Sequence, residues 1–112
     1  MEIEIREFLD VFGRSPFERW FDGLNAVKAA RVAMALTRLG QGNFSTVEGV
    51  GAGVYELKVD FGPGYRVYFG KDGDRLVILL AGSAKKRQDA AIAAAKAAWV
   101  KYRRRKGAKE QG

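Results

Sequence analysis

Three runs of the chain, 54–60, 65–69 and 76–80, have the pattern of β-strands. The first two alternate apolar and polar residues with a period of two, and the third is apolar at every position. Short segments rich in glycine, proline and aspartate separate the runs, as turns require. The pattern predicts a three-stranded antiparallel meander. Its third strand is expected at the centre of the sheet, because a strand without a polar face is covered on both sides.

Residues with helical spacing lie on both sides of this meander. A first helix is expected to begin at Pro16, with Ser15 as its N-cap and Glu18 completing a capping box. A second helix is predicted over 26–39, and the two form a helical hairpin. After the meander, an alanine-rich third helix is predicted over 89–105.

Two further segments complete the predicted fold. Ile3 and Ile5 alternate with charged residues, which predicts a short strand beside the third run of the meander. The glycine-rich stretch 42–53 is interpreted as a long loop at a functional rim. The whole chain, 1–112, is thus predicted to be one α+β domain with a small four-stranded, mostly antiparallel sheet, an N-terminal helical hairpin and a C-terminal helix. Residues 103–112 are expected to form a basic, flexible tail.

The composition narrows the chemistry that the chain can perform. It has no cysteine and no histidine, so catalysis would have to use Lys, Arg, Tyr or carboxylate side chains, and no metal site is expected. The chain begins without a signal-peptide pattern, and no apolar run reaches the roughly 18 residues that a membrane span needs, so we expect a cytoplasmic protein with no membrane partner.

The formal net charge is +7, from 20 Lys and Arg against 13 Asp and Glu. Ten of the basic residues lie within 85–109, where Asp89 is the only acidic residue. Such an excess predicts an anionic partner, and nucleic acid or an acidic protein would each fit.

The alternation in the meander places Lys58, Arg66 and Tyr68 on one face of adjacent strands, with Lys85 just beyond the third strand. We expect this face to be open to solvent, which would make a cationic, aromatic patch on a rigid sheet. Lys and Arg on a solvent face are ordinarily only solubilising residues, so the pattern alone does not establish catalysis.

Three segments resemble a known family. They are Tyr55-Glu56-Leu57-Lys58, then Asp60-Phe61-Gly62-Pro63-Gly64-Tyr65-Arg66-Val67-Tyr68-Phe69, then Leu79-Leu80-Ala81-Gly82 followed by Lys85 and Gln88-Asp89. They resemble the phage Gp49-like branch of the RelE/ParE (HigB-type) toxins of type II toxin–antitoxin modules. The resemblance runs from about Phe17 to Tyr102 and includes the order of the elements. One departure is Ala84, where relatives often have an acidic residue.

The resemblance implies a toxin that cleaves mRNA on the ribosome without a metal or cofactor. It also implies a cognate antitoxin, expected to be a helix-turn-helix protein with an acidic segment, and contact with operator DNA only through that antitoxin. Carried over by position, the catalytic residues would be Lys58, Arg66 and Lys85.

Each residue can be matched to a chemical task. Arg66 suits the phosphate, since guanidinium stays charged and grips two oxygens. Lys58 among like charges is expected to have a lowered pKa and act as the base, with Lys85 protonating the leaving group or stabilising charge. Tyr68 would stack on an unpaired base. The remaining RNA contacts are expected from Lys86, Arg87, Arg103 and Arg104.

Two alternatives remain open at this point. One is a gyrase-inhibiting, ParE-like toxin, which would need no such set of basic residues. The other is a catalytically inactive relative that uses the same basic face to bind RNA or an acidic protein.

Overall fold

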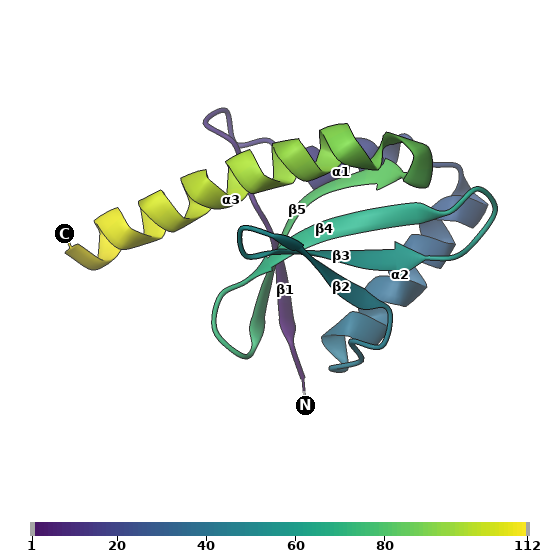
Figure 1. The fold of residues 1–112 in the computed structure, drawn as a ribbon, viewed down its shortest axis with the longest axis horizontal. Helices are drawn as coiled ribbons and strands as arrows, with labels where there is room; N and C mark the ends of the chain where they lie inside the picture. Colours follow the sequence, from purple (N-terminus) through teal and green to yellow (C-terminus); the bar gives the residue numbers. More distant parts are fainter. Residues whose placement is uncertain (1, 112) are drawn as a thin grey trace.

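The computed structural model describes residues 2–111, and the side chains of residues 2–108. Its centre is a five-stranded sheet in the order β1-β5-β4-β3-β2 (Figure 1). The strands are β1 (Glu4–Glu7), β2 (Val47–Gly51), β3 (Val54–Val59), β4 (Tyr65–Lys71) and β5 (Leu76–Ala84). β1 runs parallel to β5, and all other neighbouring strands are antiparallel. The α+β class, the meander and the position of β5 between β1 and β4 are confirmed.

The prediction of four strands is wrong, because β2 forms inside the glycine-rich stretch that was interpreted as a loop. It pairs with β3 through a two-residue turn in which Ala52 (φ 57°) and Gly53 (φ 80°) both have positive φ. Those are the dihedral angles of a type I′ hairpin turn. Glycines at two of the five strand positions weaken the local strand pattern, so pairing with β3 is what stabilises β2.

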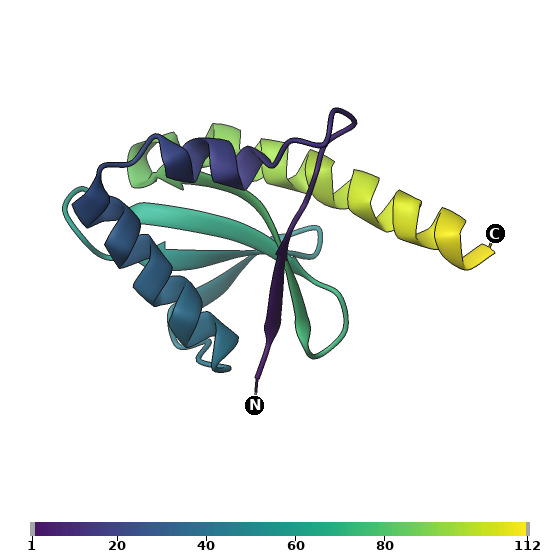
Figure 2. The same cartoon turned by 180° about the vertical axis from the view of Figure 1, so that it is seen from behind.

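Helices cover both faces of the sheet. α1 (Pro16–Asp22) and α2 (Ala26–Gly40) form the predicted hairpin on one face, and α3 (Gln88–Gln111) crosses the other (Figures 1 and 2). A 3-10 turn, η1 (Lys85–Arg87), joins β5 to α3. The predicted cap of α1 is confirmed, since Ser15 Oγ accepts a hydrogen bond from the Glu18 amide at 3.0 Å.

The sheet therefore separates two apolar cores. The hairpin side contains Leu39, Val67 and Phe69, and the α3 side contains Leu80 and Trp99. Two glycines let an indole ring lie directly on the sheet. A Cβ at Gly82 would fall 2.0 Å from the Trp20 ring of α1, and one at Gly70 would fall 2.4 Å from the Trp99 ring of α3. Both helices depend on these glycines for their close approach.

α3 is longer than the sequence pattern predicted. It continues through Gln111, six residues past the expected end at residue 105, so residues 103–111 are helical. Gly112, the last residue of the predicted tail, lies outside the described residues. Flexibility of this segment stays a prediction. Within residues 2–111, no helix has the length and apolarity needed to cross a lipid bilayer.

Candidate functional site

The predicted site residues on the sheet lie in one row across three strands. Lys58 of β3 is directly opposite Arg66 of β4, and Arg66 is opposite Ser83 of β5. With a side-chain period of two, this row shares a face with Val54 and Tyr68, which pack in the core under α3. The row therefore lies on the α3 side of the sheet, at the end where β5 leads into η1. The adjacency of Lys58 and Arg66 is confirmed.

Lys85 reaches the same end of the sheet through the turn between β3 and β4. Its amide donates to the Gly64 carbonyl at 3.0 Å. A Cβ at Gly64, which has φ 87°, would lie 3.5 Å from Lys85 Cβ and 3.7 Å from Arg66 Nη1. Both side chains therefore lie beside this turn, where the positive φ favours glycine. Lys86 and Arg87 are exposed beside them on η1, where Lys86 lines a shallow hollow with Pro63.

The expectation that Arg66 lies on an open face is wrong, because its side chain is only 7% exposed. Arg66 Nη1 donates to the carbonyl of Tyr65 at 3.0 Å. Arg66 Nε lies 3.9 Å from Glu56 Oε2, too far for a hydrogen bond, and has no hydrogen-bond partner. Glu56 is itself buried. The site thus contains a buried guanidinium with one unused donor beside a buried carboxylate, and such unsatisfied groups are rare in folded proteins.

Lys58 has the opposite of the expected pKa shift. Its Nζ lies 2.9 Å from Glu48 Oε2, and the hydrogen bond and charge of Glu48 raise the lysine pKa above its usual value. The same contact lowers the pKa of Glu48. The prediction of a lowered pKa for Lys58 is therefore wrong, because a carboxylate, and not only other cations, adjoins it. Lys58 is an ammonium at neutral pH.

Tyr68 cannot stack on an RNA base in this structure. Its side chain is fully buried in the core under α3, so the prediction that it projects from an open face is wrong. The Tyr68 hydroxyl lies 3.4 Å from Ser83 Oγ, and burial raises the tyrosine pKa. The alternation pattern identified the face correctly but not the helix that covers it.

Arg103 and Arg104 belong to a different part of the molecule. They lie on α3 about 22 Å along the helix from Gln88, at 1.5 Å per residue. Both are exposed. The structure therefore does not bring them together with Lys58, Arg66 and Lys85, and any contact that they make with RNA is a separate one.

Two acidic residues join the site that the sequence analysis did not place there. Glu48 precedes Lys58 by ten residues in the chain. It was missed because its strand, β2, was not predicted. Glu56 could have been found, since the alternation of β3 puts it on the same face as Lys58. Ala84, the position where an acidic residue was expected, is half-buried against the hairpin-side core. Acidic groups are thus present at the site, but from β2 and β3.

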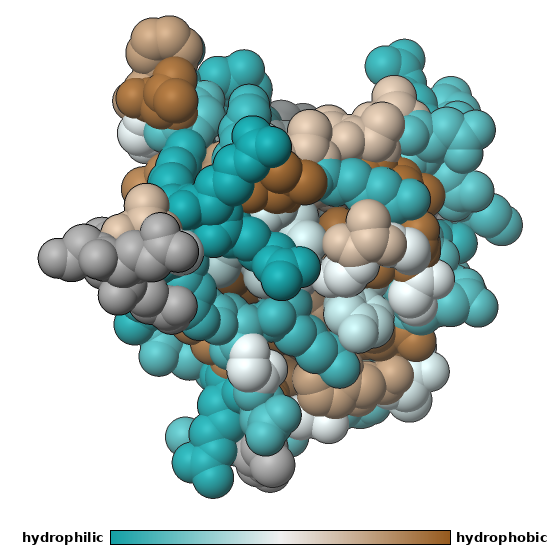
Figure 3. Space-filling model, turned by 60° about the vertical axis from the view of Figure 1, so that its left-hand side comes forward, coloured by the Kyte–Doolittle hydropathy of each residue, from teal (hydrophilic) through white to brown (hydrophobic). Residues whose placement is uncertain are grey.

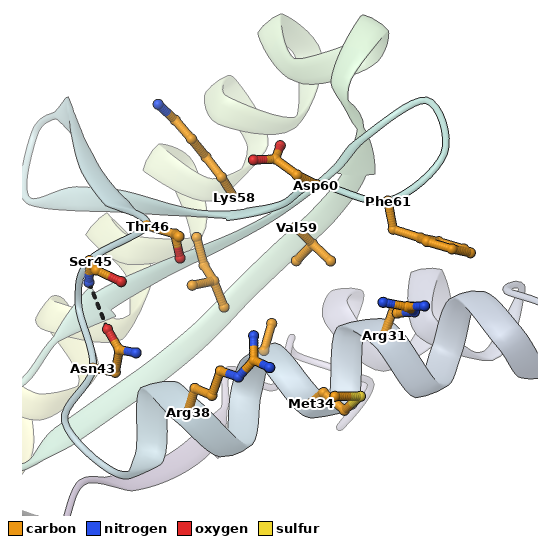
Figure 4. A pocket seen from close by; sticks show the side chains of 12 residues that line it. Arg31, Met34, Arg38, Asn43, Ser45, Thr46, Lys58, Val59, Asp60 and Phe61 are labelled. Carbon is orange, nitrogen blue, oxygen red and sulfur yellow. Dashed lines mark hydrogen bonds between the residues drawn. The ribbon is translucent and has the colours of Figure 1, made fainter.

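A second hollow lies on the opposite side of β3, between that strand and α2 (Figure 4). Arg31, Met34 and Arg38 of α2 line one wall, and the Arg31 guanidinium lies 4.6 Å from the centre of the Phe61 ring. Figure 4 shows the Lys58 side chain pointing away from α2. Lys58 also lines this hollow, whereas Arg31 and Arg38 come from α2, on the face of the sheet opposite the Lys58–Arg66 row. Nowhere in the described part of the chain do three potential metal-binding side chains cluster.

Comparison with known proteins places the chain in a family. Residues 19–103 match the family described as Phage derived protein Gp49-like (DUF891). An uncharacterized protein of Haemophilus influenzae is 41% identical over 81 residues, which is 71% of this chain and 82% of that protein. The match covers the end of α1, all of α2, the whole sheet after β1, and most of α3. The chain therefore belongs to the Gp49-like family, a RelE/HigB-like branch of the toxin–antitoxin proteins.

Proposed function

We propose that this chain is the toxin of a type II toxin–antitoxin module and that it cleaves mRNA on the ribosome. Family membership indicates a toxin with an antitoxin partner. The observation that supports cleavage is the close grouping of Lys58 and Arg66 with the carboxylates of Glu48 and Glu56 at one end of the sheet. A cationic group for the phosphate, a carboxylate and an ammonium are the groups that RNA cleavage without histidine needs.

The reaction begins when the 2′-hydroxyl of the RNA attacks the neighbouring phosphorus. Its proton passes to a carboxylate, for which Glu48 is best placed, because it is exposed and ionised beside Lys58. The bond from phosphorus to the 5′-oxygen breaks, and that oxygen takes a proton from the Lys58 ammonium. The products are a 2′,3′-cyclic phosphate and a 5′-hydroxyl. Because its pKa is raised, Lys58 is protonated, so in this proposal it donates a proton in place of acting as the base that the sequence predicted.

Arg66 holds the phosphate in this proposal, and Lys85 adds positive charge beside it. A guanidinium can bind two phosphate oxygens at once, and Arg66 Nε has a free donor for one of them. Because Arg66 is buried, the side chains that cover it have to move before RNA can reach it. Lys86 and Arg87 on η1, and Arg103 and Arg104 farther along α3, contact the RNA backbone through charge.

The burial of Arg66 favours one alternative, a relative that binds RNA or an acidic protein without cleaving it. If the side chains that cover Arg66 do not move, no phosphate reaches it, and only the exposed basic residues remain for binding. The two functions differ in whether Arg66 is needed.

Induced expression of the chain, with mapping of new 5′ ends on cellular mRNA over the following minutes, tests the proposal. Arg66→Ala removes the phosphate contact, and Arg75→Ala is the matched control, because Arg75 is exposed in the turn between β4 and β5. New mRNA ends at fixed codon positions, present with Arg75→Ala and absent with Arg66→Ala, would support cleavage. Growth arrest with intact mRNA would indicate a gyrase inhibitor, and no arrest would favour the binding protein.

A further inference from the structure

Large apolar side chains that remain exposed among the described residues gather mainly at two places. Three lie in the loop between β1 and α1, and two lie on α2. In the loop, Val11 is 80% exposed and Phe12 is 79% exposed. We call residues 9–14 the apolar tip. Figure 3 shows an apolar knob standing out at the upper left, above hydrophilic side chains. Side chains of this size held out in water are typical of a contact with another protein.

The apolar tip is a turn whose conformation is held by hydrogen bonds. Asp10 Oδ1 accepts hydrogen bonds from the amides of Phe12 at 2.8 Å and Arg14 at 3.0 Å. The Asp10 amide and carbonyl bond to Arg14 and Gly13 at 2.8 and 3.0 Å, and Gly13 has φ 76°. Four hydrogen bonds therefore hold Val11 and Phe12 outward before any partner arrives. A preorganised loop loses less conformational entropy on binding.

The base of the tip is fastened to the basic end of α3. Arg105 Nη1 donates to the Leu9 carbonyl at 2.5 Å, and its guanidinium lies 4.9 Å from the centre of the Phe8 ring. Phe8 is buried in the α3-side core. Five of the six residues over 101–106 are Lys or Arg, and none is acidic. The apolar tip and this basic segment therefore form one continuous surface.

We infer that this surface binds an acidic segment of a protein partner whose apolar side chains cover Val11 and Phe12. Negative charge on the partner complements the basic segment of α3 and steers the two together. RNA fits less well, because of the two most exposed side chains of the tip only Phe12 has a ring on which a base could stack, and Val11 has none. A second copy of the chain fits less well, because each copy carries a net charge of +7. Under the proposed function, on which this identity of the partner rests, the partner is the antitoxin.

The surface is separate from the Lys58–Arg66 row. The row lies where β5 enters η1, and the basic segment begins about 20 Å along α3 from Gln88. A partner bound to the apolar tip and the basic segment can therefore leave Lys58 and Arg66 uncovered. It would block the toxin by preventing its approach to the ribosome.

Affinity for the purified cognate antitoxin tests this inference. Arg66→Ala serves as the background for all proteins, so that cells survive expression. Val11→Ser with Phe12→Ser should weaken binding by at least about 30-fold, as loss of a central aromatic anchor does. Val27→Ser with Met34→Ser removes the two exposed apolar side chains of α2 and is the matched control, expected to change affinity less than about 3-fold. Circular dichroism should show the same folded state for both, since all four side chains are exposed.

Reversing charge by Arg103→Glu with Arg104→Glu should slow association and reduce its dependence on salt. The inference is overturned if the tip variant binds the antitoxin like its parent. It is also overturned if the tip variant changes only self-association in sedimentation or only binding of a single-stranded RNA. Growth arrest by the unmodified chain is measured separately. If the chain fails to arrest growth but its tip variant loses affinity for the antitoxin, the proposed function is contradicted. The inference about this binding surface is then still supported.

Discussion

The two faces of the sheet bury different kinds of side chain. The face under α1 and α2 buries an apolar cluster that includes Leu39, Val67 and Phe69. The face under α3 is apolar beneath Trp99, but toward η1 it buries the only two charged residues, Glu56 and Arg66, that are buried among residues 2–108. Burying charge costs free energy unless each ion is well paired, and Arg66 Nε lies 3.9 Å from Glu56 Oε2 without a hydrogen bond. The apolar residues under α1 and α2 are explained by their contribution to stability. The buried charges at one end of the face under α3 are better explained by function.

The largest effect is expected on the apolar face. Phe69→Ala should lower the free energy of unfolding by about 3–5 kcal/mol, because it leaves a cavity in a fully buried site. Urea denaturation measures the loss. Val100→Ala, at an exposed position on α3, is the control and should stay within about 0.5 kcal/mol of the parent. A loss below about 1 kcal/mol for Phe69→Ala would mean that this core is not what stabilises the sheet.

A smaller effect on stability is expected from the buried charges. Glu56→Gln with Arg66→Met should unfold within about 1 kcal/mol of the parent or be more stable, while mRNA cleavage disappears. Arg66→Met alone should cost more than the double variant, because it leaves the buried Glu56 carboxylate without its cation. A double variant as destabilised as Phe69→Ala would show that the charged end of the face is structural after all.

The contact that fastens α3 to the turn between β4 and β5 should show a modest dependence on pH. Burial and the hydrogen bond to Asp72 raise the pKa of Tyr102 to about 12. A raised pKa contributes stability below the unfolded value of 10.0, and this is lost as pH rises from there through about 12. An NMR titration should show Tyr102 ionising near 12 in the parent and nearer 10 in Asp72→Asn. A parent value near 10 would contradict the contact.

The smallest effect on stability is expected at the exposed pair of Lys58 and Glu48. Lys58 has a raised pKa, so its contribution is present below 10.5 and lost only as pH rises above that value. Glu48 has a lowered pKa, so its contribution is present above 4.5 and lost only as pH falls below that value. Stability should therefore not change between pH 6 and 9. Glu48→Gln should lower the Lys58 pKa, measured by NMR of the lysine side chain, whereas Glu18→Gln should not.

Local patterns in the sequence were enough for much of the fold. The alternation over 54–69 identified β3 and β4, and Ser15 with Glu18 located the start of α1. The same alternation predicted that Lys58 and Arg66 share a face, because side chains in a strand alternate strictly. The alternation depends only on residues that are neighbours in the chain. It therefore stays the same whichever element packs on the strand.

Local patterns along the chain were enough to predict the meander, the helical hairpin and the faces on which the basic residues lie. Packing across the whole fold is what makes α3 cover Tyr68 and leaves Arg66 buried, because alternation cannot say what packs on a face. Only strand pairing decided that β2 exists, since its glycines carry little preference of their own. That pairing brings Glu48 to Lys58 and raises the lysine pKa. The burial of Arg66 and the pKa of Lys58 both depend on residues distant in the chain. For this reason the folded structure was needed to find them.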